Sequence, residues 1–165
     1  MNQIKYNLLC ICLCLFSMSW VSCDLGEEPV IEGVAIQEMT GEWWVTFTVG
    51  GEDIYGLGYT LISTYNTASN STSEMFLDDL EHTWAFKVRV PINFESRTFS
   101  GSELANLTYE ITVNVSNGLI TKGSTESTGG NITDGISFDV EFSDDPGTVY
   151  HMEGYRRTGF QEDEH

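Results

Sequence analysis

The chain of 165 residues is long enough for one domain, with or without a processed leader. Acidic residues outnumber basic ones 25 to 7, which gives a formal net charge of −18. Such a negative surface repels phosphate backbones and anionic headgroups, which argues against nucleic acid as a partner and against adsorption to an anionic bilayer. Contact with lipid is therefore expected in an apolar interior or through a covalent anchor.

Residues 1–22 have the pattern of a lipoprotein signal peptide. Lys5 is the one cation of a short polar start, and the run that follows is almost wholly apolar and uncharged. This run is too short to span a bilayer as a helix, which takes about 20 residues, but it suits the hydrophobic region of a signal peptide. Cys23 follows the small residue Ser22, as in bacterial lipoprotein cleavage sites, although Trp20 replaces the usual leucine. We therefore predict cleavage after residue 22 and lipidation of Cys23.

All the cysteines lie in this leader or at its border: Cys10, Cys12, Cys14 and Cys23. The rest of the chain therefore has neither a disulfide framework nor a thiolate metal site. A redox or metal cluster of the three leader cysteines is an alternative, but cysteine is also an ordinary apolar residue in such a run. We predict no metal site and no cofactor.

The chain after the leader divides into three parts. Residues 23–40 begin with the lipidated cysteine and continue as a polar, acidic stretch, which predicts a flexible tether. Residues 41–160 are rich in strand patterns and form the predicted folded domain. Residues 161–165 are an acidic tail that we expect to lie in solvent.

Residues 41–49 form the strand around which the others are expected to arrange. Trp43, Val45 and Phe47 alternate toward one face, while Trp44 and two threonines point to the other. Nearly all these residues are β-branched or aromatic, and the Gly-Gly that follows is a hairpin signal.

Further strand-like runs follow with turn residues between them. Residues 84–90 alternate most clearly, and Pro91 then marks an edge strand or the end of the strand. Asn117-Gly118 is a two-residue hairpin signal. In chain order, the predicted strands after the first cover residues 57–67, 74–80, 84–90, 107–115, 119–124, 136–142 and 149–159.

About eight sequential strands joined by short turns predict an all-β fold. Long meanders of this kind close into antiparallel up-and-down barrels, because closure removes the exposed edges. An eight-stranded barrel has an interior that side chains just fill or that holds one small ligand. A two-sheet β-sandwich is the alternative, but it needs strand-switching connections for which these turns are short.

The opening Gly41-x-Trp43 is similar to the first strand of lipocalins and related calycin barrels. In those folds a basic residue near the last strand packs across this tryptophan at the closed end of the barrel, so the resemblance implies a partner for Trp43. Arg156 and Arg157 are the two candidates. Neighbouring strand residues face opposite ways, so one of them can serve, and we favour Arg157.

The chain also resembles the lipid-binding putative hydrolase family of Bacteroidetes lipoproteins. The resemblance is carried by residues 41–45, 64–68, 134–138 and 154–160. It implies a calycin-like (lipocalin-like) β-barrel that binds lipid. Acidic tethers of this type accompany surface export in such lipoproteins, which implies an outer-membrane protein that faces the periplasm or the cell surface. The resemblance brings no established catalytic residues.

The sequence contains no Gly-x-Ser-x-Gly elbow of a serine hydrolase. His82 lies in a polar turn and His165 in the tail, so neither is a promising base. His151 lies on the last strand, where acidic residues are plentiful, and is the one candidate base. Catalytic residues are otherwise unknown.

Two pairs of neighbouring carboxylates occur at strand ends or turns and are possible sites. Asp78-Asp79 ends a strand and is a candidate for calcium at the rim, but no calcium-loop spacing supports this. Asp144-Asp145 precedes Pro-Gly and is better explained as a turn.

Aromatic residues at alternating strand positions are the remaining signal. They predict either a packed core or an apolar ligand cavity, in which Tyr59, Tyr65 or Tyr109 would orient a ligand through their hydroxyls. The candidates for lining this cavity are Trp43, Phe47, Tyr59, Tyr65, Trp84, Phe86, Tyr109, Phe138 and Phe142.

Three functions remain open. The first is a non-enzymatic, lipid-anchored barrel that binds a hydrophobic small molecule such as a lipid or fatty acid. The second is a hydrolase that acts on a lipid or ester. The third is an accessory subunit of an outer-membrane surface complex, which binds a protein partner through outward aromatics such as Trp44.

Overall fold

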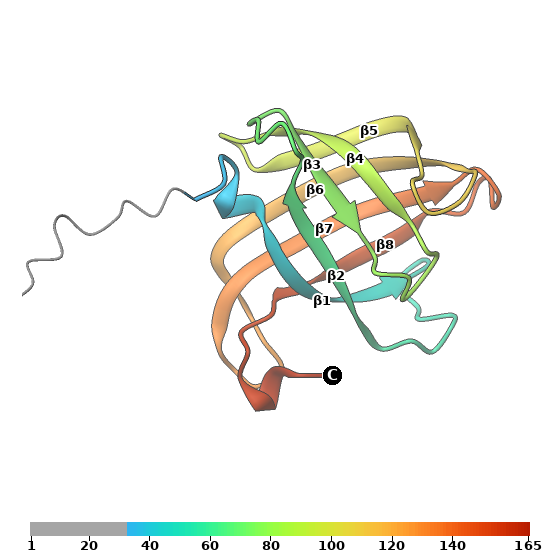
Figure 1. Cartoon of the computed structure of the whole chain (residues 1–165). Helices are drawn as coiled ribbons and strands as arrows, with labels where there is room; N and C mark the ends of the chain where they lie inside the picture. Colours follow the sequence, from blue (N-terminus) through green and yellow to red (C-terminus); the bar gives the residue numbers. More distant parts are fainter. Residues whose placement is uncertain (1–32) are drawn as a thin grey trace, which may run out of the picture. The chain divides into compact units, whose positions relative to one another are not determined.

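The computed structural model describes residues 33–165, which form a closed antiparallel barrel (Figure 1). Each strand pairs with its neighbours in sequence, and the last pairs with the first. The strands are β1 (Gly41–Thr48), β2 (Tyr59–Asn66), β3 (Glu74–Asp78), β4 (Lys87–Asn93), β5 (Thr98–Ala105), β6 (Thr112–Glu126), β7 (Ile132–Phe142) and β8 (Tyr150–Arg156). The predicted up-and-down barrel of eight strands is confirmed, and the β-sandwich alternative is wrong.

Two short 3₁₀ turns flank the barrel, η1 (Gln37–Met39) before β1 and η2 (Gln161–Asp163) after β8. Among residues 33–165 no helix is long and apolar enough to cross a bilayer. The predicted signal peptide and the lipidation site Cys23 lie outside the described residues.

The barrel closes where β1 pairs with β8, from Trp43 opposite Arg156 to Thr48 opposite His151. Gly154 lies in the middle of this seam, and a Cβ atom there would collide with the carbonyl oxygen of Trp44. A glycine is therefore required for the two backbones to approach this closely.

Side chains fill the interior of the barrel. Each of the eight strands contributes at least one inward-facing apolar residue that is at most 2% exposed. A side chain without accessible surface borders no void large enough for water, so these residues form a close-packed core rather than a hollow. The largest are Trp43, Phe47, Phe86, Phe138, Phe142 and Tyr150.

The predicted hairpin at Asn117-Gly118 is wrong, because both residues lie within the single long strand β6. The pairing with β7 shifts register between Ser116 and Leu119, and Asn117 has a φ of 54°, which together describe a bulge. Gly118 lies against Phe99 of β5, so a larger residue would not fit there. Pairing on both sides of β6 overrides the local turn signal.

Two neighbouring segments also differ from expectation. β5 has no counterpart among the predicted strands, whereas residues 107–109, expected to begin a strand, lie in the loop after β5. Pro91 does not end its strand, because β4 continues to Asn93 with Pro91 opposite Glu74.

Both ends of the described chain pack onto the barrel. Ile36 and Met39, in the segment expected to be part of a flexible tether, are fully buried in the core cluster. In the tail, expected to lie in solvent, Asp163 is fully buried and His165 stacks on Tyr59 with ring centroids 4.3 Å apart. Apolar and hydrogen-bonding contacts therefore hold both segments in place.

Candidate functional site

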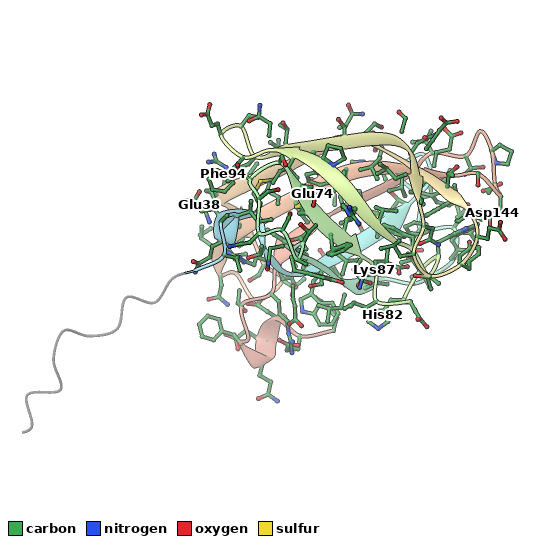
Figure 2. All side chains as sticks on the ribbon, turned by 45° about the horizontal axis from the view of Figure 1, so that its top comes forward. Glu38, Glu74, His82, Lys87, Phe94 and Asp144 are labelled. Carbon is green, nitrogen blue, oxygen red and sulfur yellow. The ribbon has the colours of Figure 1, made fainter. Side chains whose placement is uncertain are left out.

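The loops at one end of the barrel carry most of the exposed apolar side chains. These loops are residues 49–58, 79–86, 106–111 and 143–149, and we call this end the aromatic end. Asp144 marks it in Figure 2, opposite the end marked by Glu38 and Phe94. Of the ten exposed large hydrophobic residues in the described chain, these loops hold seven: Ile54, Tyr55, Leu57, Leu80, Leu107, Tyr109 and Val149.

Aromatic rings stack beneath these loops. Phe47 of β1 lies parallel to Tyr150 of β8, with centroids 4.6 Å apart, and Tyr55 lies 6.1 Å from Phe47 and 6.3 Å from Tyr150. Trp84 stacks on Phe142 at 4.9 Å. Tyr55 is half exposed, so it forms the outermost layer of this stack.

Carboxylates of the turn between β7 and β8 tie the loops together. Asp144 accepts hydrogen bonds from the indole of Trp84 at 3.1 Å and from the hydroxyl of Tyr109 at 2.9 Å. Asp145 accepts one from Tyr150 at 2.6 Å, and the hydroxyls of Tyr150 and Tyr55 lie 3.1 Å apart. The Asp144-Asp145 pair therefore does more than form a turn.

The two phenols that bond these carboxylates remain protonated. Burial and the hydrogen bond to Asp144 raise the pKa of Tyr109 to about 12. Burial and the hydrogen bond to Asp145 likewise raise the pKa of Tyr150 well above its ordinary value. Both hydroxyls are thus neutral donors at physiological pH.

The loop of residues 49–58 lies over the stack, and most of its hydrogen bonds are internal to the loop, such as those between Val49 and Glu52. Gly51 and Gly58 have φ values of 87° and 64°, and no other part of the chain lies within 4 Å of the position a Cβ would take. The loop is held by the carboxylate of Asp53, which accepts the backbone N–H groups of Leu57 and Gly58. This geometry suits a loop that moves as a unit and carries Tyr55 with it.

The loop of residues 79–86 is fixed in contrast. The buried carboxylate of Asp79 accepts hydrogen bonds from the backbone of Glu81, from the backbone and hydroxyl of Thr83, and from the backbone of Trp84. These donors occupy the oxygens that the calcium hypothesis requires, and Asp78 accepts the hydroxyl of Tyr65. Residues 33–165 contain no cluster of three or more potential metal ligands.

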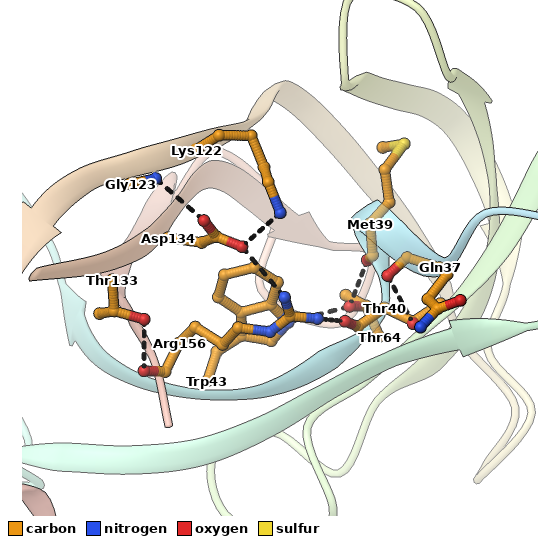
Figure 3. A network of polar contacts seen from close by, with 10 residues as sticks. All are labelled: Gln37, Met39, Thr40, Trp43, Thr64, Lys122, Gly123, Thr133, Asp134 and Arg156. Atoms are coloured by element: carbon orange, nitrogen blue, oxygen red, sulfur yellow. Dashed lines mark hydrogen bonds and ion pairs between the residues drawn. The ribbon is translucent and has the colours of Figure 1, made fainter. Parts of the chain in front are cut away.

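The opposite end is closed by the tryptophan–arginine pair (Figure 3). The guanidinium carbon of Arg156 lies 5.5 Å from the ring centroid of Trp43. Arg156 also contacts Asp134 at 3.0 Å and the carbonyl of Thr40, and Lys122 contacts Asp134 at 2.8 Å. Burial alone would raise the pKa of Asp134, but its contacts with Lys122, Gly123 and Arg156 lower it overall.

The preference for Arg157 as the partner of Trp43 is wrong. The register of β8 against β1 turns Arg156 toward the interior and Arg157 outward. Arg157 instead forms ion pairs with Glu42 at 2.7 Å and Glu164 at 2.8 Å on the surface.

The residues predicted to line a cavity separate into three groups. Trp43, Phe47, Phe86, Phe138 and Phe142 face the interior but are packed without a void. Trp84 and Tyr109 belong to the aromatic end. Tyr59 and Tyr65 lie on the outer wall, because Thr60, Ile62 and Thr64 are the inward residues of β2. Neither of these two tyrosines can orient a ligand inside the barrel.

The sequence analysis missed Tyr55 and Tyr150 as members of the site. An aromatic residue within a glycine-rich loop, as at Tyr55, is a usable signal for an exposed contact residue. Its contact with Tyr150 joins residues 95 positions apart, which one sequence without a fold does not reveal.

His151 does have an orienting acid. Its Nδ1 lies 2.6 Å from Asp139, which is also held by Asn117 at 2.7 Å, all on the outer wall. Within residues 33–165, however, no serine, threonine or tyrosine hydroxyl hydrogen-bonds the imidazole, whose Nε2 lies 3.5 Å from Glu153. The arrangement supplies a base and its orienting group without an adjacent nucleophile.

A second apolar surface lies on the outer wall of β1 and β2. This hollow of about 350 Å³ is lined by Trp44, Tyr59, Thr60, Leu61, His82 and His165. The ring of His165 meets Trp44 edge-on at 5.3 Å, and Trp44 is only 8% exposed. Trp44 does point outward, but the expectation that it is an exposed docking residue is wrong because the tail covers it.

Comparison with known proteins supports one family. The model of the family described as lipid-binding putative hydrolase matches residues 28–161, which is most of the chain. A search of curated proteins gave no match. The match includes the whole barrel, with the Trp43–Arg156 closure and the aromatic end. The chain belongs to the lipid-binding putative hydrolase family.

Proposed function

We propose that this protein is a lipid-anchored, extracytoplasmic binding protein that holds a hydrophobic ligand, such as a lipid, at the aromatic end of its barrel. Family membership and the β-barrel fit lipid binding. The leader and Cys23 support an anchor in the outer membrane, with the barrel on the periplasmic or cell-surface side.

The choice of the aromatic end as the binding site rests on one observation. Exposed large apolar side chains gather on the loops of the aromatic end, directly above buried aromatic rings. Concentrations of this kind on a soluble protein mark places where an apolar partner binds. Among residues 33–165 the opposite end carries few exposed large apolar side chains, and Trp43, Arg156 and the buried Met39 close it.

Binding involves movement of the loop of residues 49–58, because the interior is already packed. When this loop swings away, Tyr55 leaves the stack and the ring faces of Phe47 and Tyr150 become available to an acyl chain. Each methylene group that the ligand buries there contributes about 0.8 kcal/mol. The fixed loop that carries Trp84 provides the stationary wall.

Native mass spectrometry tests the proposal directly. The chain from residue 24 onward contains the whole closed barrel and is expected to carry apolar molecules from the host through purification. After delipidation it should take up added monododecanoylglycerol. Bare protein before and after this addition would refute the binding function.

The pair of His151 and Asp139 favours one second candidate, a hydrolase of lipids or esters that uses His151 as a general base for water. A panel of ester substrates tests it. Hydrolysis that is lost in His151→Ala and retained in His82→Ala would support this function. Activity that is absent, or equal in the two variants, would remove it.

A further inference from the structure

We infer that the aromatic end selects hydrophobic ligands that carry a positive amine or quaternary ammonium group, in preference to fatty acid carboxylates. This inference rests on the proposed function and names the chemical class of its ligand. It follows from the charges of the loops and from their aromatic faces.

The loops of the aromatic end carry acidic residues and no lysine or arginine. Their acidic residues are Glu52, Asp53, Asp79, Glu81, Glu110, Asp144 and Asp145. The nearest lysine or arginine along the chain is Lys87, which lies on the outer wall and pairs with Asp78 at 3.3 Å. A ligand carboxylate at this end would meet repulsion from several directions.

The carboxylates of these loops lack cationic partners within residues 33–165. None of them takes part in an ion pair with a lysine, arginine or histidine of the described chain. Asp144 and Asp145 are held in place by hydroxyl and indole donors instead. A cationic group on the ligand would supply the missing charge without displacing a protein partner.

Exposed rings stand beside these carboxylates. Tyr109 is 40% exposed and donates a hydrogen bond to Asp144. Tyr55 is half exposed, and its hydroxyl contacts that of Tyr150, which in turn donates a hydrogen bond to Asp145. A cation within about 6 Å of a ring face is attracted by the quadrupole of the ring, and quaternary ammonium groups are bound in this way by aromatic cages. The aromatic faces and the carboxylates therefore both favour a cationic group on the ligand.

Isothermal titration with three dodecyl ligands tests this inference. At neutral pH and below the micelle concentrations, dodecyltrimethylammonium is expected to bind the chain from residue 24 onward about tenfold more tightly than neutral monododecanoylglycerol. Dodecanoate should bind most weakly. The ammonium preference should shrink with added salt, while the affinity for the neutral ligand should not fall.

Paired variants separate a specific site from general attraction to an acidic protein. Asp144→Asn with Asp145→Asn keeps hydrogen-bond acceptors and is expected to abolish the preference for the ammonium ligand. Glu95→Gln with Glu162→Gln removes the same charge from exposed positions at the other end and in the tail, and should leave the preference unchanged.

Each outcome decides a different question. If the neutral ligand binds but the ammonium ligand is not preferred, the inference is overturned while the proposed function stands. The same holds if the two paired variants reduce the preference for the ammonium ligand equally. If dodecanoate binds most tightly, the inference is likewise overturned. If none of the three ligands binds, the inference falls together with the proposed function.

Discussion

Arg156 lies over the ring of Trp43, and the two residues are direct partners across the seam that closes the barrel. The same guanidinium contacts Asp134 and the carbonyl of Thr40, so one side chain joins β8, β7 and the segment before β1. This pair closes one end of the cylinder, and under the proposed function the ligand would exchange at the aromatic end.

Removing Arg156 should therefore destabilise the fold. In Arg156→Met we expect the free energy of unfolding to fall by about 2 kcal/mol, because a cation–π contact and a charged hydrogen bond are lost while Lys122 still pairs with Asp134. Urea denaturation measures this loss. Arg157→Met is the matched control and should cost less, because its ion pairs lie on the surface. Equal losses in the two variants would contradict the assignment.

Gly154 should tolerate no side chain. In Gly154→Ala the new methyl group would meet the backbone of Trp44 and Val45, which cannot move aside without opening the seam. We expect a loss of about 3 kcal/mol, or failure to fold, as seen for overpacked cores. Thermal denaturation followed by circular dichroism checks this. Glu153→Ala, at the neighbouring exposed position, should unfold near the wild-type temperature.

Alternation alone predicts an all-β meander, but it identifies neither every strand nor the limits of each one. β1 and β7 alternate strongly; β1 appears where the sequence indicates it, whereas β7 begins at Ile132, before the predicted start at residue 136. β5 was missed because Phe99 is its one fully buried residue and its pairing is irregular at Gly101. The predicted total of eight agrees with the structure only because the missing β5 is offset by the division of β6 into two predicted strands.

The sequence predicts the types of residue in the candidate site better than it predicts where these residues lie in the fold. Aromatic residues and the absence of a catalytic motif are visible in the sequence. The pairing of Trp43 with one of two arginines is implied by the resemblance to calycin barrels. The choice between Arg156 and Arg157 depends on a one-residue register that alternation cannot fix. The contacts of Tyr55 and Trp84 require knowledge of which loops share an end of the barrel.

The tail should be held by an ionised carboxylate. Burial alone would raise the pKa of Asp163, but hydrogen bonds from Ser127, Thr158, Asn131 and the backbone of Gly129 outweigh it and lower the pKa to about 2. The unfolded value is about 4, so this group stabilises the fold above pH ~4, and the contribution is lost as the pH falls toward 2.

Comparison with Asp163→Asn isolates this effect from the other carboxylates. The difference in unfolding free energy between wild type and variant should be largest above pH ~4 and should shrink as the pH falls to about 2. Urea denaturation across this range measures it. A difference that stays constant with pH would mean that the charge of Asp163 does not hold the tail.

The loop of residues 49–58 should control affinity through Tyr55. In Tyr55→Ala we expect the affinity for monododecanoylglycerol to fall about tenfold, because the loop can no longer close an aromatic ring over the acyl chain that occupies the faces of Phe47 and Tyr150. Leu61→Ala alters the apolar hollow on the outer wall and should leave the affinity unchanged. Fluorescence titration measures both. Weaker binding in Leu61→Ala alone would place the ligand in the hollow beside Trp44.

Photo-crosslinking with a diazirine-labelled monoacylglycerol tests the location of the ligand most directly. After irradiation and digestion, mass spectrometry should find the label on the loops of the aromatic end, at residues 49–58, 79–86, 106–111 and 143–149. Label concentrated on the outer wall around Tyr59 and Leu61, or spread evenly over the barrel, would contradict the account.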